Sequence, residues 1–235
     1  MGSGSDVARR LGAVRERIAR AAARAGRDPA AITLVAVTKT VAPPRIAEAI
    51  EAGQRDFGEN RVQEALEKIP HLPPVRWHMI GHLQRNKARK VVGRFELIHS
   101  VDTPRLVDTL DRLGRERGLV VRTLIEVNVG GEASKSGIAP EELPALLDHA
   151  AGREGLSVEG LMTVPPWTDD PQDARPYFAA LARLRDREAA VRRPGVRLAH
   201  LSMGMSHDFE VAIEEGATIV RVGSAIFGPR PPASG

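Results

Sequence analysis

The amino-acid sequence predicts a single-domain α/β protein with the architecture of a closed (β/α)8 (TIM) barrel. Short, nearly continuous apolar segments alternate with amphipathic segments along the chain, as expected for parallel strands that are covered on both faces. This alternation implies a parallel sheet, and eight segments of each type imply that the sheet closes into a barrel. An open doubly wound sheet is the alternative, but no GxGxxG motif follows the first apolar segment.

The expected strands are short apolar runs. They span residues 32–38, 55–58, 75–80, 96–101, 121–128, 157–163, 196–202 and 218–222. The expected helices begin at capping residues or prolines and stop at glycines; Thr103 and Pro104, for example, open a helix that ends before Gly118. The helices lie near residues 5–26, 43–53, 60–68, 83–92, 104–118, 141–151, 173–191 and 207–215.

One helix of the repeating pattern is missing from this prediction, because the chain ends in GPRPPASG soon after the last strand. We expect the helix at residues 5–26, which precedes the first strand, to fill that gap in the ring. A single domain therefore accounts for residues 1–235, with residues 1–5 and 230–235 as expected flexible tails.

The composition argues against several classes of protein. The chain has no cysteine, which excludes a disulfide framework, a thiol nucleophile and a zinc–thiolate site and is typical of a cytoplasmic protein. No apolar run approaches the roughly 20 residues that span a bilayer, so no membrane association is expected. The net charge is +4, but acidic residues are interspersed with the arginines and aromatic residues make up only 3% of the chain. Nucleic acid is therefore not an expected partner.

The histidines do not predict a metal site. His78 and His82 have the spacing of a helical metal-binding pair, but they are expected at a strand end and a turn, and no HExxH glutamate accompanies them. The remaining histidines are scattered along the sequence. Packing and polar contacts are the expected roles of these side chains.

The first expected strand leads into a lysine. Five of its first six residues are apolar, and Lys39 follows in a chain that contains only five lysines. Active sites of (β/α)8 barrels lie at the C-terminal ends of the strands, which is where Lys39 is expected. Such a lysine either extends to water or, when partly desolvated, loses its proton and attacks carbonyl groups as a Schiff-base nucleophile.

Glycine and serine gather after the seventh and eighth expected strands. The segment LSMGMSHDF contains Ser202, Gly204 and Ser206, and the segment RVGSAIFG contains Gly223 and Ser224. Glycines let backbone N–H groups approach an anion, hydroxyl groups add donors, and the loops after strands seven and eight are the usual phosphate site of this fold. Ordinary turns are the alternative interpretation.

The lysine and the glycine–serine loops converge in a closed barrel, because strand eight then lies beside strand one. A ligand that carries both a phosphate and an aldehyde fits this pair, and pyridoxal 5′-phosphate is such a ligand. Arg221 precedes the last glycine turn and could face the pyridine nitrogen, which its permanent charge would keep unprotonated. A salt bridge from Arg221 to a barrel carboxylate is the alternative.

At these residues the sequence resembles the YggS/PROSC family, the pyridoxal phosphate homeostasis proteins. The resemblance rests on short segments that occur in family order from about residue 32 to residue 229, namely VAVTKT, FGENRVQE, WHMIGHLQRNK, ASKSGI, GLMT, LSMGMSHDFEVAI and RVGSAIFG. The segments are short individually, and together they are highly specific.

The resemblance implies a barrel similar to the N-terminal domain of alanine racemase, with pyridoxal 5′-phosphate held on Lys39 as an internal aldimine. It implies that Arg221 meets the pyridine nitrogen and that Asn60 lies beside the cofactor. It also implies phosphate contacts from Ser202, Met203, Gly204, Gly223 and Ser224. Family members look like carriers or regulators in vitamin B6 homeostasis without robust turnover, so apo enzymes that use this cofactor are expected as transient recipients.

A racemase-like enzyme acting on amino acids is the leading alternative. Such an enzyme needs a second acid/base group on the opposite face of the cofactor, and in alanine racemases a tyrosine from a C-terminal β domain supplies it. Here the chain ends just after strand eight and its one tyrosine, Tyr177, is expected on an outer helix, so we expect no robust turnover. A Schiff-base lyase acting on a phosphosugar is a third hypothesis.

A second lysine is expected at the same end of the barrel. Lys135 follows the fifth expected strand, and it either takes cofactor in transit or is an ordinary loop charge. No large exposed apolar stripe is evident in the sequence, so we expect a monomer.

Overall fold

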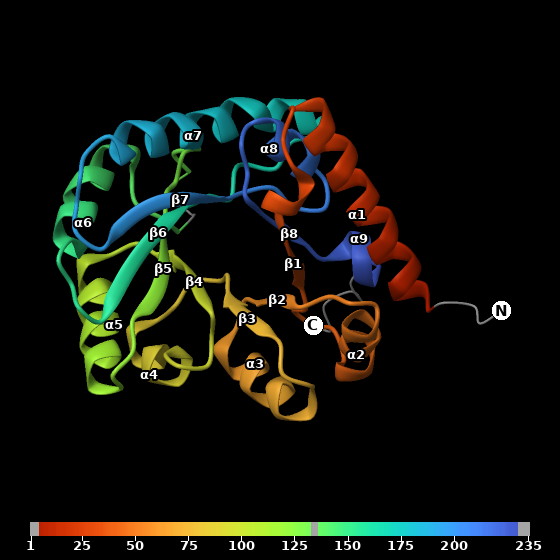
Figure 1. The fold of residues 1–235 in the computed structure, drawn as a ribbon, viewed down its shortest axis with the longest axis horizontal. Coiled ribbons are helices and arrows are strands. Elements are labelled where there is room, and N and C mark those ends of the chain that lie inside the picture. The colour runs from red at the N-terminus through yellow and green to blue at the C-terminus, as the bar shows by residue number, and fades with distance from the viewer. Residues whose placement is uncertain (1–4, 133–135, 230–235) are drawn as a thin grey trace.

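The computed structural model describes residues 5–132 and 136–229, and it confirms the predicted barrel. Eight parallel strands pair in chain order and β1 closes the ring by pairing with β8 (Figure 1). The strands are β1 (Thr33–Val37), β2 (Asp56–Glu59), β3 (Arg76–Met79), β4 (Leu97–Val101), β5 (Val121–Glu126), β6 (Leu156–Met162), β7 (Val196–Ser202) and β8 (Ile219–Val222).

Helices surround the sheet (Figure 1). They are α1 (Asp6–Arg24), α2 (Pro43–Glu51), α3 (Val62–Lys68), α4 (Ala88–Val91), α5 (Pro104–Glu116), α6 (Leu143–Ala150), α7 (Arg175–Ala189), α8 (Phe209–Glu214) and α9 (Ser224–Phe227). The expectation of no helix after the last strand was wrong, because α9 forms one turn there. The helix expected near residues 83–92 is shorter than predicted, since a 3-10 turn over Arg85–Lys87 precedes α4.

The first helix fills the gap in the ring, as predicted. One side of α1 is apolar and buried, with Val7, Leu11, Val14 and Ile18 at spacings of three and four residues. This face contacts α8, α9 and α2, beside which α1 lies in Figure 1. Arg17 of α1 contacts α8 in two ways. It forms a salt bridge with Glu210, and its guanidinium lies 4.6 Å from the ring centroid of Phe209 in a cation–π contact.

The apolar core has two parts. The larger part lies between the sheet and the helices, as parallel strands covered on one face by helices require. A smaller cluster, formed by Val35, Leu97, Leu124, Met162 and Ile219, contains residues from β1, β4, β5, β6 and β8. Side chains two apart on a strand share a face, so Arg221 lies on the same face of β8 as Ile219.

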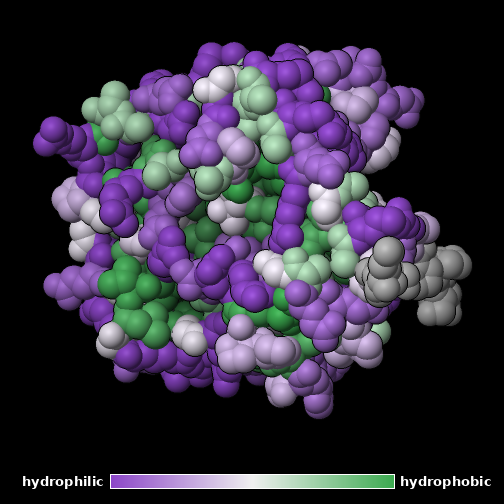
Figure 2. Space-filling view, turned by 45° about the vertical axis from the view of Figure 1, so that its right-hand side comes forward, coloured by the Kyte–Doolittle hydropathy of each residue, from purple (hydrophilic) through white to green (hydrophobic). Residues whose placement is uncertain are grey.

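The surface is mostly hydrophilic. Figure 2 shows polar residues over most of the visible face, with hydrophobic residues gathered in the hollows between them. Within residues 5–132 and 136–229, the large hydrophobic side chains that are exposed are Val120, Val164, Trp167 and Val191. Among these residues no helix has the length and hydrophobicity needed to cross a bilayer.

Candidate functional site

The ends of the first and last strands meet at the C-terminal end of the barrel. β1 pairs with β8 so that Ala36 lies opposite Val222, and the chain runs on from these two strands to Lys39 and to Gly223. One cavity of about 330 Å³ is lined by five of the predicted site residues, namely Lys39, Asn60, Arg221, Gly223 and Ser224. The structure therefore brings the lysine and the glycine–serine turn together.

Lys39 projects from a turn whose backbone is held on both sides. The buried Thr38 donates from Oγ1 to Oε1 of Glu59 over 2.6 Å. Thr40 has a φ of 64°, a left-handed conformation that is unusual for a β-branched residue, and its backbone N–H donates to Oε1 of Glu64 over 2.5 Å. These contacts fix the backbone on each side of Lys39.

Lys68 joins the contacts around this turn into one network. Its Nζ donates to the backbone oxygen of Thr38 over 2.6 Å. It also donates to Oε1 of Glu59 over 2.9 Å and to Oε1 of Glu64 over 2.5 Å. Burial raises the pKa of the Glu59 carboxyl, while Thr38 and Lys68 act in the opposite direction. The ammonium of Lys68 thus offsets part of the cost of burying Glu59.

Backbone donors converge on the other side of the cavity. The N–H groups of Gly223 and Ala225 both donate to Oγ of Ser206, over 3.2 Å and 3.3 Å. Ser206 and Ser224 line the cavity at this point. N–H groups that meet on one oxygen form an anion-binding cradle, so this wall suits a phosphate group.

Three other predicted site residues are buried beside the cavity. Ser202 is fully buried, and its Oγ accepts a hydrogen bond from Arg221 over 2.6 Å. The backbone N–H of Met203 donates to a carbonyl of β8 over 3.1 Å, so it is already used in the fold. Gly204 has a φ of 90°, and a Cβ atom there would lie 2.6 Å from Cβ of Ala212. Gly204 therefore has a packing role, none of these three residues is among those that line the cavity, and their phosphate contacts stay predictions.

Arg221 is almost completely buried and is held by two acceptors. Nη1 donates to Oγ of Ser202 over 2.6 Å, and Nη2 donates to the backbone oxygen of Thr163 over 2.8 Å. Desolvation lowers the pKa of Arg221 to about 10, against the effect of Glu126 and Asp208, so the group stays charged at neutral pH. Over residues 5–132 and 136–229, Arg221 forms no salt bridge. The alternative interpretation, in which Arg221 pairs with a barrel carboxylate, was therefore wrong.

A buried carboxyl group lies at the end of β5. Glu126 is 7% exposed, and its Oε2 has no hydrogen-bond partner in the part of the chain that the structure describes. Burial and the charge of Asp102 raise the pKa of Glu126 to about 7, although Arg221 acts to lower it. This carboxyl group therefore titrates near neutral pH. Sequence analysis did not single out Glu126, although its position at the C-terminal end of a strand could have identified it as a candidate site residue.

Two aromatic side chains at the cavity were also missed by sequence reasoning. Trp167 stacks on His207 with ring centroids 4.5 Å apart and an interplanar angle of 28°, and both rings line the cavity. Trp167 is 70% exposed, so it lies at the rim. It follows β6, and attention to strand ends would again have found it.

Two expectations about other polar residues have different outcomes. Lys135 lies outside the described residues, so its role as a second cofactor lysine stays a prediction. The expectation of packing and polar contacts is confirmed for His78, whose Nδ1 lies 3.0 Å from Nε2 of His99 in the barrel interior, although the sequence did not indicate that these two rings meet. Among the described residues no cluster of three or more His, Asp and Glu side chains could hold a metal ion.

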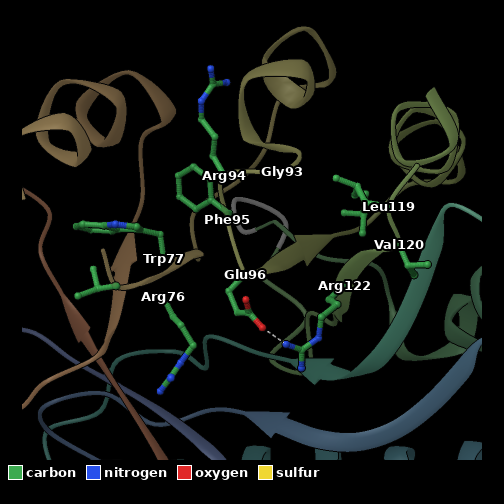
Figure 3. Close-up of a pocket in the computed structure, with 11 residues that line it drawn as sticks. Arg76, Trp77, Gly93, Arg94, Phe95, Glu96, Leu119, Val120 and Arg122 are labelled. Carbon is green, nitrogen blue, oxygen red and sulfur yellow. Dashed lines mark hydrogen bonds and ion pairs between the residues drawn. The ribbon is translucent and has the colours of Figure 1, made fainter. Parts of the chain in front are cut away.

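A cavity of about 290 Å³ lies at the opposite end of the barrel, where β3, β4 and β5 begin (Figure 3). Arg122 pairs there with Glu96 and also with Glu159. Arg76, which lines the same cavity, pairs with Asp56. These arginines already have carboxylate partners, and the cavity is separated from Lys39 by the length of the strands.

A strand-end lysine, a buried arginine and an anion cradle in one barrel cavity are the features expected of a barrel that holds a phosphorylated carbonyl compound. Residues 10–231 match the family model "Alanine racemase, N-terminal domain". Two similar proteins, each named pyridoxal phosphate homeostasis protein, come from Aquifex aeolicus and Pseudomonas aeruginosa. The first is 48% identical and covers 94% of this chain and 97% of its own; the second is 45% identical and covers 96% of each.

A solved structure is similar as well. PipY of Synechococcus elongatus, determined with pyridoxal phosphate bound, superposes with a TM-score of 0.79 at 37% identity and covers 94% of this chain and all of its own. The chain therefore belongs to the alanine racemase N-terminal domain family and, within it, to the pyridoxal phosphate homeostasis proteins.

Proposed function

We propose that this protein binds pyridoxal 5′-phosphate through Lys39 and carries or regulates it in vitamin B6 homeostasis, without robust catalytic turnover. The observation that carries the proposal is the single cavity shared by Lys39, Arg221 and the Gly223–Ser224 turn. The names of the relatives and the bound ligand of PipY support the choice of ligand.

The residues of the cavity fit this cofactor. Pyridoxal 5′-phosphate supplies an aldehyde that condenses with a primary amine, a phosphate and a pyridine ring. Lys39 provides the amine, and the cradle that now surrounds Oγ of Ser206 provides donors for the phosphate. Arg221, which can only donate, faces the ring nitrogen in this proposal and keeps it unprotonated.

A reduction experiment tests the lysine. Borohydride treatment of the protein loaded with pyridoxal 5′-phosphate should trap the cofactor on the peptide that contains Lys39. Lys39→Ala should remove the trapped adduct and the visible absorption band. Lys87→Ala is the matched control, because Lys87 lines a neighbouring groove that shares Asn60 with the main cavity. The control should keep both signals.

The position of the adduct decides the assignment. An adduct found only on Lys135, or an unchanged band in Lys39→Ala, would overturn the role of Lys39. Arg221→Glu should change the spectrum of the bound cofactor, because a carboxylate would alter the protonation of the ring nitrogen. An unchanged spectrum would place Arg221 away from the ring.

The proposal of no robust turnover is supported by the position of Tyr177. This residue lies on α7, outside the sheet, and is absent from the cavity that contains Lys39. It cannot act as a second acid/base group there without a large rearrangement. Prolonged incubation of the loaded protein with single amino-acid enantiomers is the test. Accumulation of the opposite enantiomer over many turnovers would favour a racemase instead.

Three further parts of the proposal stay predictions. They are that the protein is a monomer, that it is cytoplasmic and that it transfers cofactor to apo enzymes. Sedimentation equilibrium tests the first and cell fractionation the second. For the third, the loaded protein should activate an apo enzyme faster than free cofactor at the same total concentration.

A further inference from the structure

A continuous chain of hydrogen bonds crosses the barrel interior and ends at Arg221. Nη1 of Arg221 lies 2.6 Å from Oγ of Ser202, and that oxygen lies 2.8 Å from Nδ1 of His99. Nε2 of His99 lies 3.0 Å from Nδ1 of His78, whose Nε2 lies 3.1 Å from Oδ1 of Asp56. The chain thus connects β8 with β7, β4, β3 and β2, and all five side chains are buried.

The chemistry of the two ends is fixed. The guanidinium of Arg221 can only donate. Burial raises the pKa of Asp56, but hydrogen bonds from His78 and Arg76 lower it further, to about 2, so the carboxylate is ionised and only accepts. Arg76 binds it with Nε and Nη2 over 2.7 Å and 2.6 Å. Arg76 also lines the cavity at the far end of the barrel (Figure 3).

Fixed ends give the chain one direction when both imidazoles are neutral. Asp56 requires the proton of His78 to be on Nε2, so Nδ1 of His78 accepts from Nε2–H of His99. His99 is fully buried, and desolvation together with the charges around it holds its pKa well below the usual range. Its Nδ1 therefore accepts, and the donor within reach is the hydroxyl of Ser202.

We propose that Asp56, His78, His99 and Ser202 orient the guanidinium of Arg221 through a one-way hydrogen-bond chain, in which the two histidines are positioning residues for the arginine that meets the cofactor. The role toward the cofactor rests on the proposed function, whereas the direction of the chain does not. Ser202, polarised through the chain by a distant carboxylate, is a stronger acceptor for a buried cation than an isolated hydroxyl. Arg221 is thereby held in place without a direct carboxylate partner.

The direction of the chain is measurable in the ligand-free protein. Two-bond ¹H–¹⁵N correlation spectra of the histidine rings distinguish a proton on Nε2 from a proton on Nδ1. We expect each ring to carry its proton on Nε2 and to accept a hydrogen bond at Nδ1. A proton on Nδ1 of His99 or of His78 would reverse the direction and overturn the proposal.

Cofactor titration tests the positioning role. Ser202→Ala removes the link between Arg221 and His99, and Ser100→Ala is the matched control. Ser100 is also a fully buried serine, but its hydroxyl donates to a backbone carbonyl over 2.6 Å outside the chain. Addition of pyridoxal 5′-phosphate should move the Nδ1 resonance of His99 in the unsubstituted protein and in Ser100→Ala. It should leave that resonance unmoved in Ser202→Ala.

The affinity and the spectrum should change together. Ser202→Ala should bind pyridoxal 5′-phosphate about tenfold more weakly, as expected for the loss of one hydrogen bond to a charged group, and the absorption maximum should shift. An affinity within about twofold of the unsubstituted protein, with an unchanged spectrum, would overturn the positioning role. Failure of the unsubstituted protein to bind the cofactor would instead overturn the proposed function, and the ring tautomers would still decide the direction of the chain.

Discussion

Replacing Glu126 with glutamine should change the pH dependence of folding stability. The carboxyl group is 7% exposed, and burial together with the charge of Asp102 raises its pKa from 4.5 to about 7 in the folded protein. In the unfolded chain the pKa returns to its ordinary value. The folded state therefore binds more protons than the unfolded state between about pH 4.5 and pH 7.

The sign and size of the effect follow from this difference. The stability that protonated Glu126 contributes is fully present below the unfolded pKa of 4.5 and is lost as the pH rises through about 7. One pKa unit corresponds to about 1.36 kcal/mol, so the loss across this window is about 3 kcal/mol. Glutamine does not titrate. The stability difference between Glu126→Gln and the unsubstituted protein should therefore move by about 3 kcal/mol in favour of the variant from pH 4.5 to pH 8.

Urea unfolding at a series of pH values measures this change. Other buried acids titrate equally in both proteins, so their contributions cancel in the difference. Any constant cost of burying the glutamine amide cancels as well. Glu67→Gln, at an exposed position of α3, is the control and should change the profile by less than about 0.5 kcal/mol. A difference for Glu126→Gln that is constant across the pH range would refute a carboxyl group that titrates near neutrality.

Three other substitutions test the packing around the cavity, each by urea unfolding. Gly204→Ala should destabilise the protein by about 2–4 kcal/mol, because the new Cβ would lie 2.6 Å from that of Ala212 at a φ of 90°; a loss under about 1 kcal/mol would contradict this. Lys68→Met should cost about 3–5 kcal/mol by leaving Glu59 buried without its cation, and adding Glu59→Gln should recover part of that loss. Thr40→Gly should stabilise the turn by up to about 1 kcal/mol while slowing reaction of Lys39 with the cofactor, and an unchanged rate would show that the strained turn does not orient the lysine.

The barrel itself could be predicted because its strands are short apolar runs that alternate with amphipathic helices. The boundaries agree to within two residues for all eight strands, for example 32–38 against Thr33–Val37. The last helix was missed because α9 is a single turn, Ser224–Phe227, which is too short to show a helical period. Local sequence patterns therefore predict the repeated strands and helices of the barrel. A single-turn helix such as α9 depends instead on contacts that form once the barrel has closed.

The sequence predicts those site residues whose positions follow directly from the strand that precedes them. Lys39 and Gly223 follow strands that are adjacent in any closed eight-stranded barrel, so their proximity follows from topology. The roles of Ser202 and Ser206 could not be separated in this way. Ser202 is the last residue of β7 and points into the interior, whereas Ser206 lies in the loop and reaches the cavity. That distinction depends on where the strand ends, which is the least certain part of a sequence-based prediction.

The contact between His78 and His99 illustrates why the interior chain was not predicted. These residues are on neighbouring strands, but their partners Asp56 and Ser202 come from β2 and β7, which are three strands apart in the ring. Contacts across a barrel depend on strand stagger and tilt, which local sequence does not encode.

The polar chain and the apolar interior cluster occupy partly different strands, because both contain residues of β4 and β8 but only the polar chain contains residues of β2, β3 and β7. The apolar interior cluster contains residues from β1, β4, β5, β6 and β8 and none from β2 or β3. Asp56 and His78, the lower part of the polar chain, come from those two strands. Buried polar groups are tolerated only when each donor meets an acceptor, so a chain with fixed ends must be complete from Asp56 to Arg221. A leucine at any one of its positions would leave neighbours unsatisfied. Replacing Asp56, His78, His99 and Ser202 together with apolar residues would avoid that cost, but Arg221 would then keep only its hydrogen bond to the backbone oxygen of Thr163.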